Sequence, residues 1–259
     1  MAGKRRTEAD DVPYLLPLQL ALGAALLGIW ELAGANQVSS LASRPSLVLA
    51  RLWLWITTDL HVHVATTLTE MILGLAIGTT LGVLAGITLG RSPLLSTLLR
   101  PLIVAAYSVP LIALVPLIIM FFGIDMLPKI VLISIVVFFL LLFNTFSGVQ
   151  AIDKDMIASI QIMGSTQREE FQKVIAPAAM AWIIGGVKTA LPYALVAATT
   201  GEMLASRSGV GFLVMRGAQR FDMPALYAGL LVLMIIGLLI SDIATRIEKW
   251  MLRWRHAAE

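Results

Sequence analysis

The sequence lacks several features on which enzymes and soluble proteins depend. It has no cysteine, which excludes disulfides, thiolate zinc sites and cysteine nucleophiles. Only 14% of its residues are charged, whereas roughly 25% are charged in soluble domains. No GxxxxGK[ST] phosphate loop, HExxH motif or GxSxG motif occurs. We therefore expect a non-catalytic chain that binds no cofactor and does not itself hydrolyse ATP.

Histidine is also scarce, and the sequence predicts no metal site. His61 and His63 form a pair just before a long apolar run. Residues two apart on a helix diverge, and no carboxylate cluster completes a metal site there. We interpret both as histidines at a membrane interface.

Apolar residues are abundant and gather in long runs. They make up 58% of the 259 residues. The runs are Tyr14–Gly34, Ala65–Gly90, Leu99–Gly123, Leu127–Val149, Ala178–Leu204 and Ala225–Ala244. A helix of about 20 residues rises about 30 Å, enough to cross the hydrocarbon core of a bilayer. The sequence therefore predicts an all-α polytopic membrane protein with about six transmembrane helices.

The distribution of basic residues predicts the orientation. With the N-terminus inside, 12 of the 19 Lys and Arg lie in inner segments, six in outer segments, and Lys188 within a span. Basic residues favour the cytoplasmic side. We expect a multi-pass protein with a cytoplasmic tail at 1–13, a membrane domain at 14–246 and a cytoplasmic tail at 247–259. The polar stretch 150–177 then lies in the cytoplasm.

The second apolar run contains a stripe of glycines. They recur at every fourth position: Gly74, Gly78, Gly82, Gly86 and Gly90. This spacing places them along one helix face, where a neighbouring backbone can approach closely. The stripe predicts helix packing within the bundle, or a dimer contact or moving pore helix.

Prolines interrupt the third run, at Pro110 and Pro116. An internal proline removes a helical hydrogen bond and kinks the axis. We expect a kinked third span, whose prolines either line a translocation path or serve helix packing.

Ionisable residues within the spans are few, and they include Lys188 and Glu202. Such residues are candidates for functional sites by default. No carboxylate relay for a proton-coupled carrier is evident. Lys188 either faces a water-filled path that favours anions or extends to the inner interface. We include Lys188 and Glu202 with Pro110 and Pro116 as candidate path residues.

The stretch Gln150–Pro177 is far longer than a turn between two spans requires. Asp153 or Asp155 can cap a short helix ending near Met163. Gly164 permits a sharp turn, and Thr166 with Glu169 has the spacing of a capping box. We expect Pro177 to end this element. Two short helices that meet at a glycine are suited to a cleft in another protein, or to lying as a pair on the membrane surface.

The order of motifs from this loop onward resembles a known family. Gly164-Ser165-Thr166 is followed by Phe171, Val174 and Pro177, then by Gly185-Gly186-Val187-Lys188, Gly201-Glu202-Met203 and Ser208-Gly209-Val210-Gly211. This order resembles the EAA loop and following span of binding-protein-dependent ABC transporter permeases. In the nitrate/sulfonate/taurine branch the pattern runs G-A-S, F, V, L-P, G-L-R, A-E-M and G-L-G. Aligned on Gly164, the family's Glu-Ala-Ala falls on Ala158-Ser159-Ile160, so its glutamate is absent.

The resemblance implies the fold of a type I ABC importer permease in the bacterial inner membrane. It implies two permease copies that form the pore, two ATPase subunits carrying ATP and Mg, and an outer solute-binding protein. No nucleic acid partner is implied. The ATPase-coupling positions would be Asp155, Ala158, Ser159, Gly164, Ser165, Phe171 and Pro177, within the 155–173 loop.

The substrate that the resemblance implies is a small anion such as a sulfonate, taurine or nitrate. A thiamine precursor or another organic solute is the alternative within the family. The outer segment Ser206–Pro224 either faces the binding protein or is a solvated basic face. Outside the family, the alternatives are a stand-alone secondary transporter or channel and a membrane scaffold protein.

Overall fold

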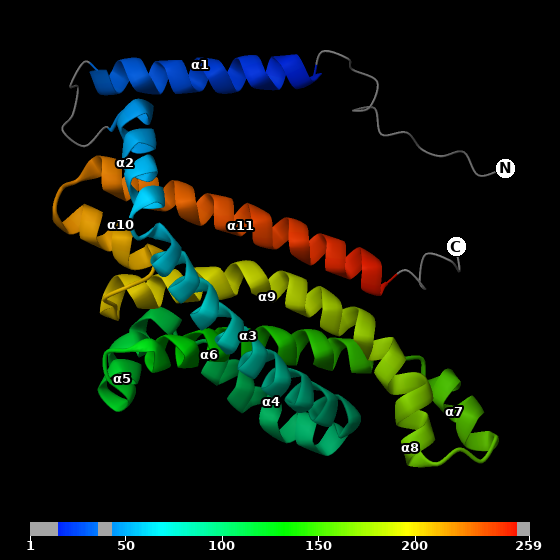
Figure 1. Cartoon of the computed structure of the whole chain (residues 1–259). Coiled ribbons are helices and arrows are strands. Elements are labelled where there is room, and N and C mark those ends of the chain that lie inside the picture. The colour runs from blue at the N-terminus through cyan, green and yellow to red at the C-terminus, as the bar shows by residue number, and fades with distance from the viewer. Residues whose placement is uncertain (1–14, 36–42, 253–259) are drawn as a thin grey trace.

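The computed structural model describes residues 15–35 and 43–252, and these form helices with no β-strand among them (Figure 1). The helices are α1 (Leu15–Ala35), α2 (Pro45–Thr57), α3 (Leu60–Arg91), α4 (Pro93–Tyr107), α5 (Leu111–Phe122), α6 (Met126–Gln150), α7 (Lys154–Ile162), α8 (Gln167–Glu170), α9 (Ala176–Ala205), α10 (Val210–Gln219) and α11 (Met223–Met251). A π-helical turn, Phe171–Ile175, joins α8 to α9. Residues 1–13 lie outside the described part, and α11 extends past the expected boundary at 246.

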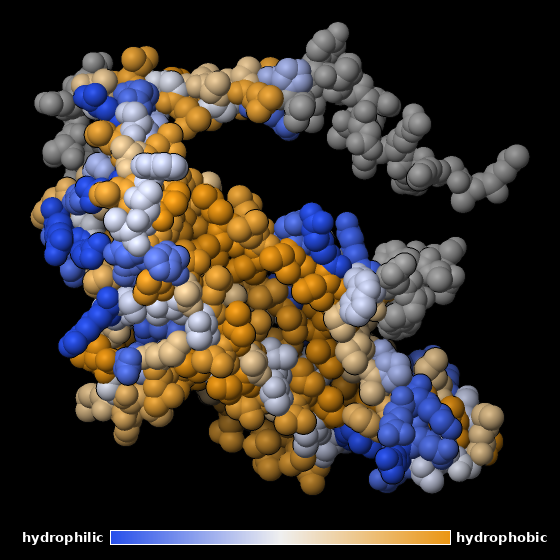
Figure 2. Space-filling view, viewed as in Figure 1, coloured by the Kyte–Doolittle hydropathy of each residue, from blue (hydrophilic) through white to orange (hydrophobic). Residues whose placement is uncertain are grey.

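Five helices in the described ranges are long and apolar enough to span a membrane, and the bent pair α4–α5 makes a sixth if counted as one span. The all-α polytopic prediction is therefore confirmed. Large apolar side chains remain exposed along these helices, including Leu26, Leu81 and Leu238 at 53–64%. Figure 2 shows this apolar surface along the body, with hydrophilic residues gathered at its two ends. A bilayer is the solvent that such a surface requires.

The glycine stripe lies against α6, the helix with which α3 makes its most extensive contact. A Cβ at Gly74 would lie 2.5 Å from the Ile133 Cβ, and one at Gly82 would lie 2.6 Å from the Phe138 carbonyl oxygen. The stripe continues in the same way to Gly90, where a Cβ would meet Val149 at 2.6 Å. The absence of side chains thus allows α3 and α6 to pack backbone to backbone.

The helix α9 packs on the other side of α6 and completes the core. Its small buried residues Ala190, Ala194 and Ala198 contribute to one apolar cluster with Val137 and Leu141 of α6. α6 is therefore the central helix, buried between α3 and α9. It connects the two ends of the molecule, which are called here the hairpin end (α7–α8) and the opposite end (α10).

The third span differs from the expected single kinked helix. It is divided into α4 and α5, which meet at an angle of 89°. Pro110 occupies the N-cap of α5 with extended backbone, whereas Pro116 lies inside α5. Pro110 has no N–H to donate and its ring disfavours helical geometry in the preceding residue, so the helix ends before it.

Pro177 does not end the loop element, contrary to our expectation. The helix continues from Gln167 to Ala205. Immediately before Pro177, the Ala176 N–H donates to the Phe171 carbonyl, five residues back, in the π-helical turn. A proline ring clashes with the carbonyl four residues earlier in a regular α-helix. The wider π-helical turn changes the position of the preceding carbonyl groups relative to the ring, so the helix continues past Pro177.

Candidate functional site

The loop at the hairpin end forms the short helix α7 that the sequence predicted, whereas the expected second short helix, α8, is the start of the long helix that runs to Ala205. The Asp153 carboxylate caps α7 by accepting from the Asp155 N–H at 2.8 Å. Gly164 then turns the chain with φ of +81°, in the left-handed region that glycine favours. Thr166 and Glu169 form the predicted capping box at the start of α8. The hairpin therefore has a defined shape of its own.

The rear of the hairpin is attached to three membrane helices. The Arg91 guanidinium at the end of α3 lies over the Phe171 ring, 5.6 Å from its centroid. The Phe171 side chain also packs against an apolar cluster that contains Val149 of α6 and Ala179 of α9. The base of the hairpin therefore contacts α3, α6 and α9.

The front of the hairpin exposes large apolar side chains. Ile162 is 87% exposed and Met163 is 85% exposed, immediately before the turn at Gly164. Met156 lies 56% exposed on α7, beside the exposed Ala158. Large apolar side chains exposed on an otherwise polar loop are typical of a surface that binds another protein or a membrane.

The remaining coupling candidates have local roles. The Ser159 hydroxyl donates to the Asp155 carbonyl at 2.7 Å, within α7. The Ser165 hydroxyl is buried and has no hydrogen-bond partner in the described part of the chain. Pro177 lies in the first turn of α9. The structure thus brings Asp155, Ser159 and Ser165 into the hairpin and places Pro177 at its base.

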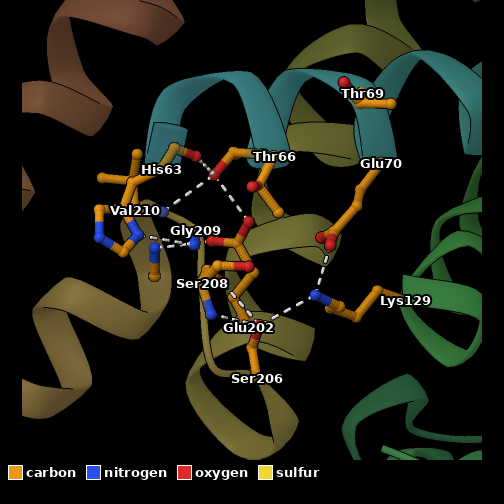
Figure 3. Close-up of polar contacts among 12 residues, drawn as sticks. His63, Thr66, Thr69, Glu70, Lys129, Glu202, Ser206, Ser208, Gly209 and Val210 are labelled. Atoms are coloured by element: carbon orange, nitrogen blue, oxygen red, sulfur yellow. Dashed lines mark hydrogen bonds and ion pairs between the residues drawn. The ribbon is translucent and has the colours of Figure 1, made fainter. Parts of the chain in front are cut away.

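A buried polar network lies at the opposite end (Figure 3). The Glu202 carboxylate accepts a hydrogen bond from the Thr67 hydroxyl at 2.6 Å and another from the Gly211 N–H at 2.7 Å. Glu70 forms an ion pair with Lys129, whose ammonium group also donates to the Ser206 hydroxyl at 2.9 Å. The network joins α3, α6 and α9 to the segment that begins α10.

The two glycines of the segment Gly209–Gly211 explain how this segment approaches Glu202 so closely. Gly209 has φ of +109°, and a Cβ there would overlap the Glu202 carboxyl group. A Cβ on Gly211 would lie 2.5 Å from the Thr199 carbonyl oxygen. Only glycine permits this close approach. Glu202, expected as a candidate path residue, therefore lies at 1% exposure in a helix junction.

His63 belongs to the same junction. Its Nδ1 accepts from the Gly209 N–H at 3.0 Å, and its Nε2 lies 3.5 Å from the Asp59 carboxylate. Partial burial raises the pKa of Asp59, but hydrogen bonds from Thr58 and His63 outweigh it and hold that pKa below its usual value. No group of three or more metal-ligating side chains occurs among the described residues.

Lys188 has a partner that the sequence did not indicate. Its ammonium group forms an ion pair with Glu248 of α11 at 2.6 Å, toward the hairpin end. Both side chains are partly exposed, at 40% and 26%. The pair connects α9 to α11, so much of the Lys188 charge is already compensated.

Besides a small cavity lined by Lys129 and an open one lined by Arg100, three cavities follow α4 and α5 in a row. The first, of about 230 Å³, lies toward the hairpin end and is lined by Arg100, Ser147 and Phe143 among others. The second, of about 380 Å³, is lined by Tyr107, Phe139 and Tyr193 among others. The Tyr107 ring contacts Phe143 at 5.3 Å between centroids, so this aromatic pair separates the first two cavities.

The third cavity, of about 350 Å³, shares Tyr193 with the second and extends past Pro110 to Thr200. Of the four residues expected to line a path, Pro110 alone lines one of these three cavities. Arg100, Tyr107, Tyr193 and Thr200 were not identified from the sequence. Each occurs in an apolar helix without a recognisable motif, so only the helix packing reveals that they face one row.

The family profile of the binding-protein-dependent transport system inner membrane component matches residues 78–253. The chain belongs to this family. The matched region contains the hairpin, the broken span and Glu202 with the start of α10, whereas the α3 members of the junction precede it. The predicted resemblance to ABC transporter permeases is thereby confirmed.

Relatives of this permease differ in the solutes for which they are named. A Bacillus subtilis protein named as an aliphatic sulfonates transport permease, SsuC, is 30% identical over 93% of this chain and 88% of its own. The formylaminopyrimidine transport permease ThiX of Halalkalibacterium halodurans is 27% identical over 89% and 92%. The taurine transport permease TauC of Escherichia coli is 28% identical over 88% and 87%.

Among solved structures, the permease resembles a chain of the inward-facing MetNI methionine ABC transporter. The TM-score is 0.65 with 18% identity, over 73% of this chain and 94% of that one. At this identity the likeness concerns the fold alone. It confirms the helix arrangement of an ABC importer permease.

Proposed function

We propose that this permease forms, as a homodimer, the translocation path of an ATP-driven importer and that its α7–α8 hairpin inserts into a separate ATPase subunit. Two ATPase subunits, which carry ATP and Mg, would take one hairpin each. Closure of the ATPases would move the hairpins and switch the pore between its two access states. Both termini and the hairpin end would face the cytoplasm.

The observation that carries this proposal is the exposed apolar tip on an anchored hairpin. Ile162 and Met163 face outward at more than 80% exposure, while Phe171 and Arg91 attach the base to the bundle. Side chains as exposed as these contribute little to the packing of the hairpin itself. A rigid hairpin that presents them can both bind a partner and transmit its motion.

The substrate that we propose is a small organic anion such as a sulfonate or taurine, delivered by an outer solute-binding protein. The names of SsuC and TauC support this choice. The name of ThiX supports a thiamine precursor as the second candidate. The solute would move along the row of three cavities beside α4 and α5.

Co-purification with the cognate ATPase tests the hairpin. The double change Ile162→Asp and Met163→Asp should abolish retention of the ATPase while the permease stays in the membrane fraction. Phe221→Asp is the matched control, because Phe221 is 78% exposed at the opposite end. The control should retain the ATPase fully. Equal retention by both variants would refute hairpin docking.

Reconstitution tests whether transport needs the partner. Liposomes that contain the permease, the ATPase and the binding protein should accumulate solute only when ATP is present on the ATPase side. Uptake by liposomes that contain this chain alone would contradict the proposal and favour a stand-alone carrier or channel.

A further inference from the structure

The first cavity of the row has a different electrostatic character from the other two. It is lined by Ser96 and Arg100 of α4, Ser147 of α6 and an apolar wall that includes Phe143 and Phe146. No acidic residue lines it, and the other two cavities have no charged side chain in their walls. Arg100 is therefore the single cation along the three cavities.

Arg100 has no ion-pair or hydrogen-bond partner in the part of the chain that the structure describes. It lies about 10 Å along α4 from Pro93, at the helical rise of about 1.5 Å per residue. Ser147, on the facing helix α6, precedes the end of that helix by about one turn. Arg100 is exposed, and with no carboxylate partner among the described residues its charge is available to an anion.

We propose that Arg100, together with Ser96 and Ser147, binds the oxyanion head of an amphipathic ligand whose apolar body lies against Phe143 and Phe146. The guanidinium presents planar paired donors that match a sulfonate, phosphate or carboxylate, and the hydroxyls supply further donors. The aromatic wall suits the apolar body.

Two sources supply this chemistry: a transported organic sulfonate and the headgroup of an anionic lipid. If the ligand is the transported sulfonate, the inference rests on the proposed function, and Arg100 is a specificity-determining contact. If the ligand is a lipid headgroup, the inference does not depend on transport. Binding to the full chain in neutral-detergent micelles therefore tests the site separately from ATP-driven uptake.

The first measurement is calorimetric titration with hexanesulfonate, with hexanol as the uncharged comparison. Wild type should bind hexanesulfonate and not hexanol, and Arg100→Gln should weaken binding about tenfold to a hundredfold, as loss of a charge-assisted contact predicts. Arg100→Lys should give an intermediate value, because lysine keeps the charge and loses the fork. Arg246→Gln is the matched control, since Arg246 is exposed on α11 and pairs with Asp242.

The second measurement counts phosphatidylglycerol molecules retained by the chain from mixed-lipid nanodiscs, by native mass spectrometry. A loss of retained lipid in Arg100→Gln, without hexanesulfonate binding by wild type, would support the site and assign it to lipid. If neither ligand depends on Arg100 while the variant remains monodisperse, or if hexanol binds as well as hexanesulfonate, the proposal is overturned. Binding that survives while uptake fails would count against the proposed function alone.

Discussion

The Glu202 carboxylate accepts a hydrogen bond from the Thr67 hydroxyl at 2.6 Å, although 135 residues separate the two in sequence. Both side chains are buried at the opposite end of the bundle, at 1% and 0% exposure. The same carboxylate also accepts a hydrogen bond from the Gly211 N–H, so it connects α3 and α9 to the start of α10. Glu202 is thus one of several groups that position α10, beside the hydrogen bonds that His63 and Thr67 accept from Gly209 and Val210.

Replacing Glu202 with Leu should destabilise the permease. The change leaves the Gly211 N–H without its buried acceptor and removes the Thr67 contact, at a cost of about 2–5 kcal/mol in the free energy of unfolding. The thermal unfolding midpoint in detergent should fall by roughly 4–20 °C, at about 2–4 °C per kcal/mol for a chain of this size. Glu248→Leu, which breaks a partly exposed pair, should change the stability by about 1 kcal/mol or less. Equal shifts of the unfolding midpoint in both variants would show that the buried network stabilises the fold no more than the partly exposed ion pair does.

Gly82→Ala should weaken the packing of α3 on α6. The new methyl group would lie 2.6 Å from the Phe138 carbonyl oxygen, so the helices must separate, at a cost of about 1–3 kcal/mol. Gly185→Ala is the control, because a Cβ at Gly185 meets nothing within 4 Å. Yield in the membrane fraction and the unfolding midpoint measure the effect. A Gly82→Ala variant as stable as the control would contradict close packing at that position.

Gly164→Ala should impair coupling more than stability. The left-handed backbone at φ +81° costs an alanine about 1–2 kcal/mol, which shifts the hairpin toward other turns. We expect ATP hydrolysis to continue in the reconstituted transporter while solute uptake per ATP falls. Gly123→Ala also strains a positive-φ backbone, at φ +80° and ψ −172°, but away from the hairpin, and should leave that ratio unchanged. A proportional loss of uptake and hydrolysis in Gly164→Ala would argue against a coupling role.

The sequence determined those features that depend on local or periodic chemistry. Long apolar runs predicted the membrane spans, because length and hydropathy alone decide whether a helix can cross a bilayer. The caps at Asp153 and Thr166 and the turn at Gly164 were also predictable, since each depends on groups a few residues apart. The regular spacing of the α3 glycines showed that they share one face.

Tertiary structure alone decided which distant residues meet. Nothing local pairs Lys129 with Glu70, or Lys188 with Glu248, because these contacts depend on how α6, α9 and α11 pack. Packing also decided that the span divides at Pro110 while the helix continues through Pro177, although both positions are proline. At Pro177 a π-helical turn accommodates the ring, whereas at Pro110 the chain bends by 89°. Arg100 became a candidate ligand contact for the same reason: only the assembled helices place it in a cavity.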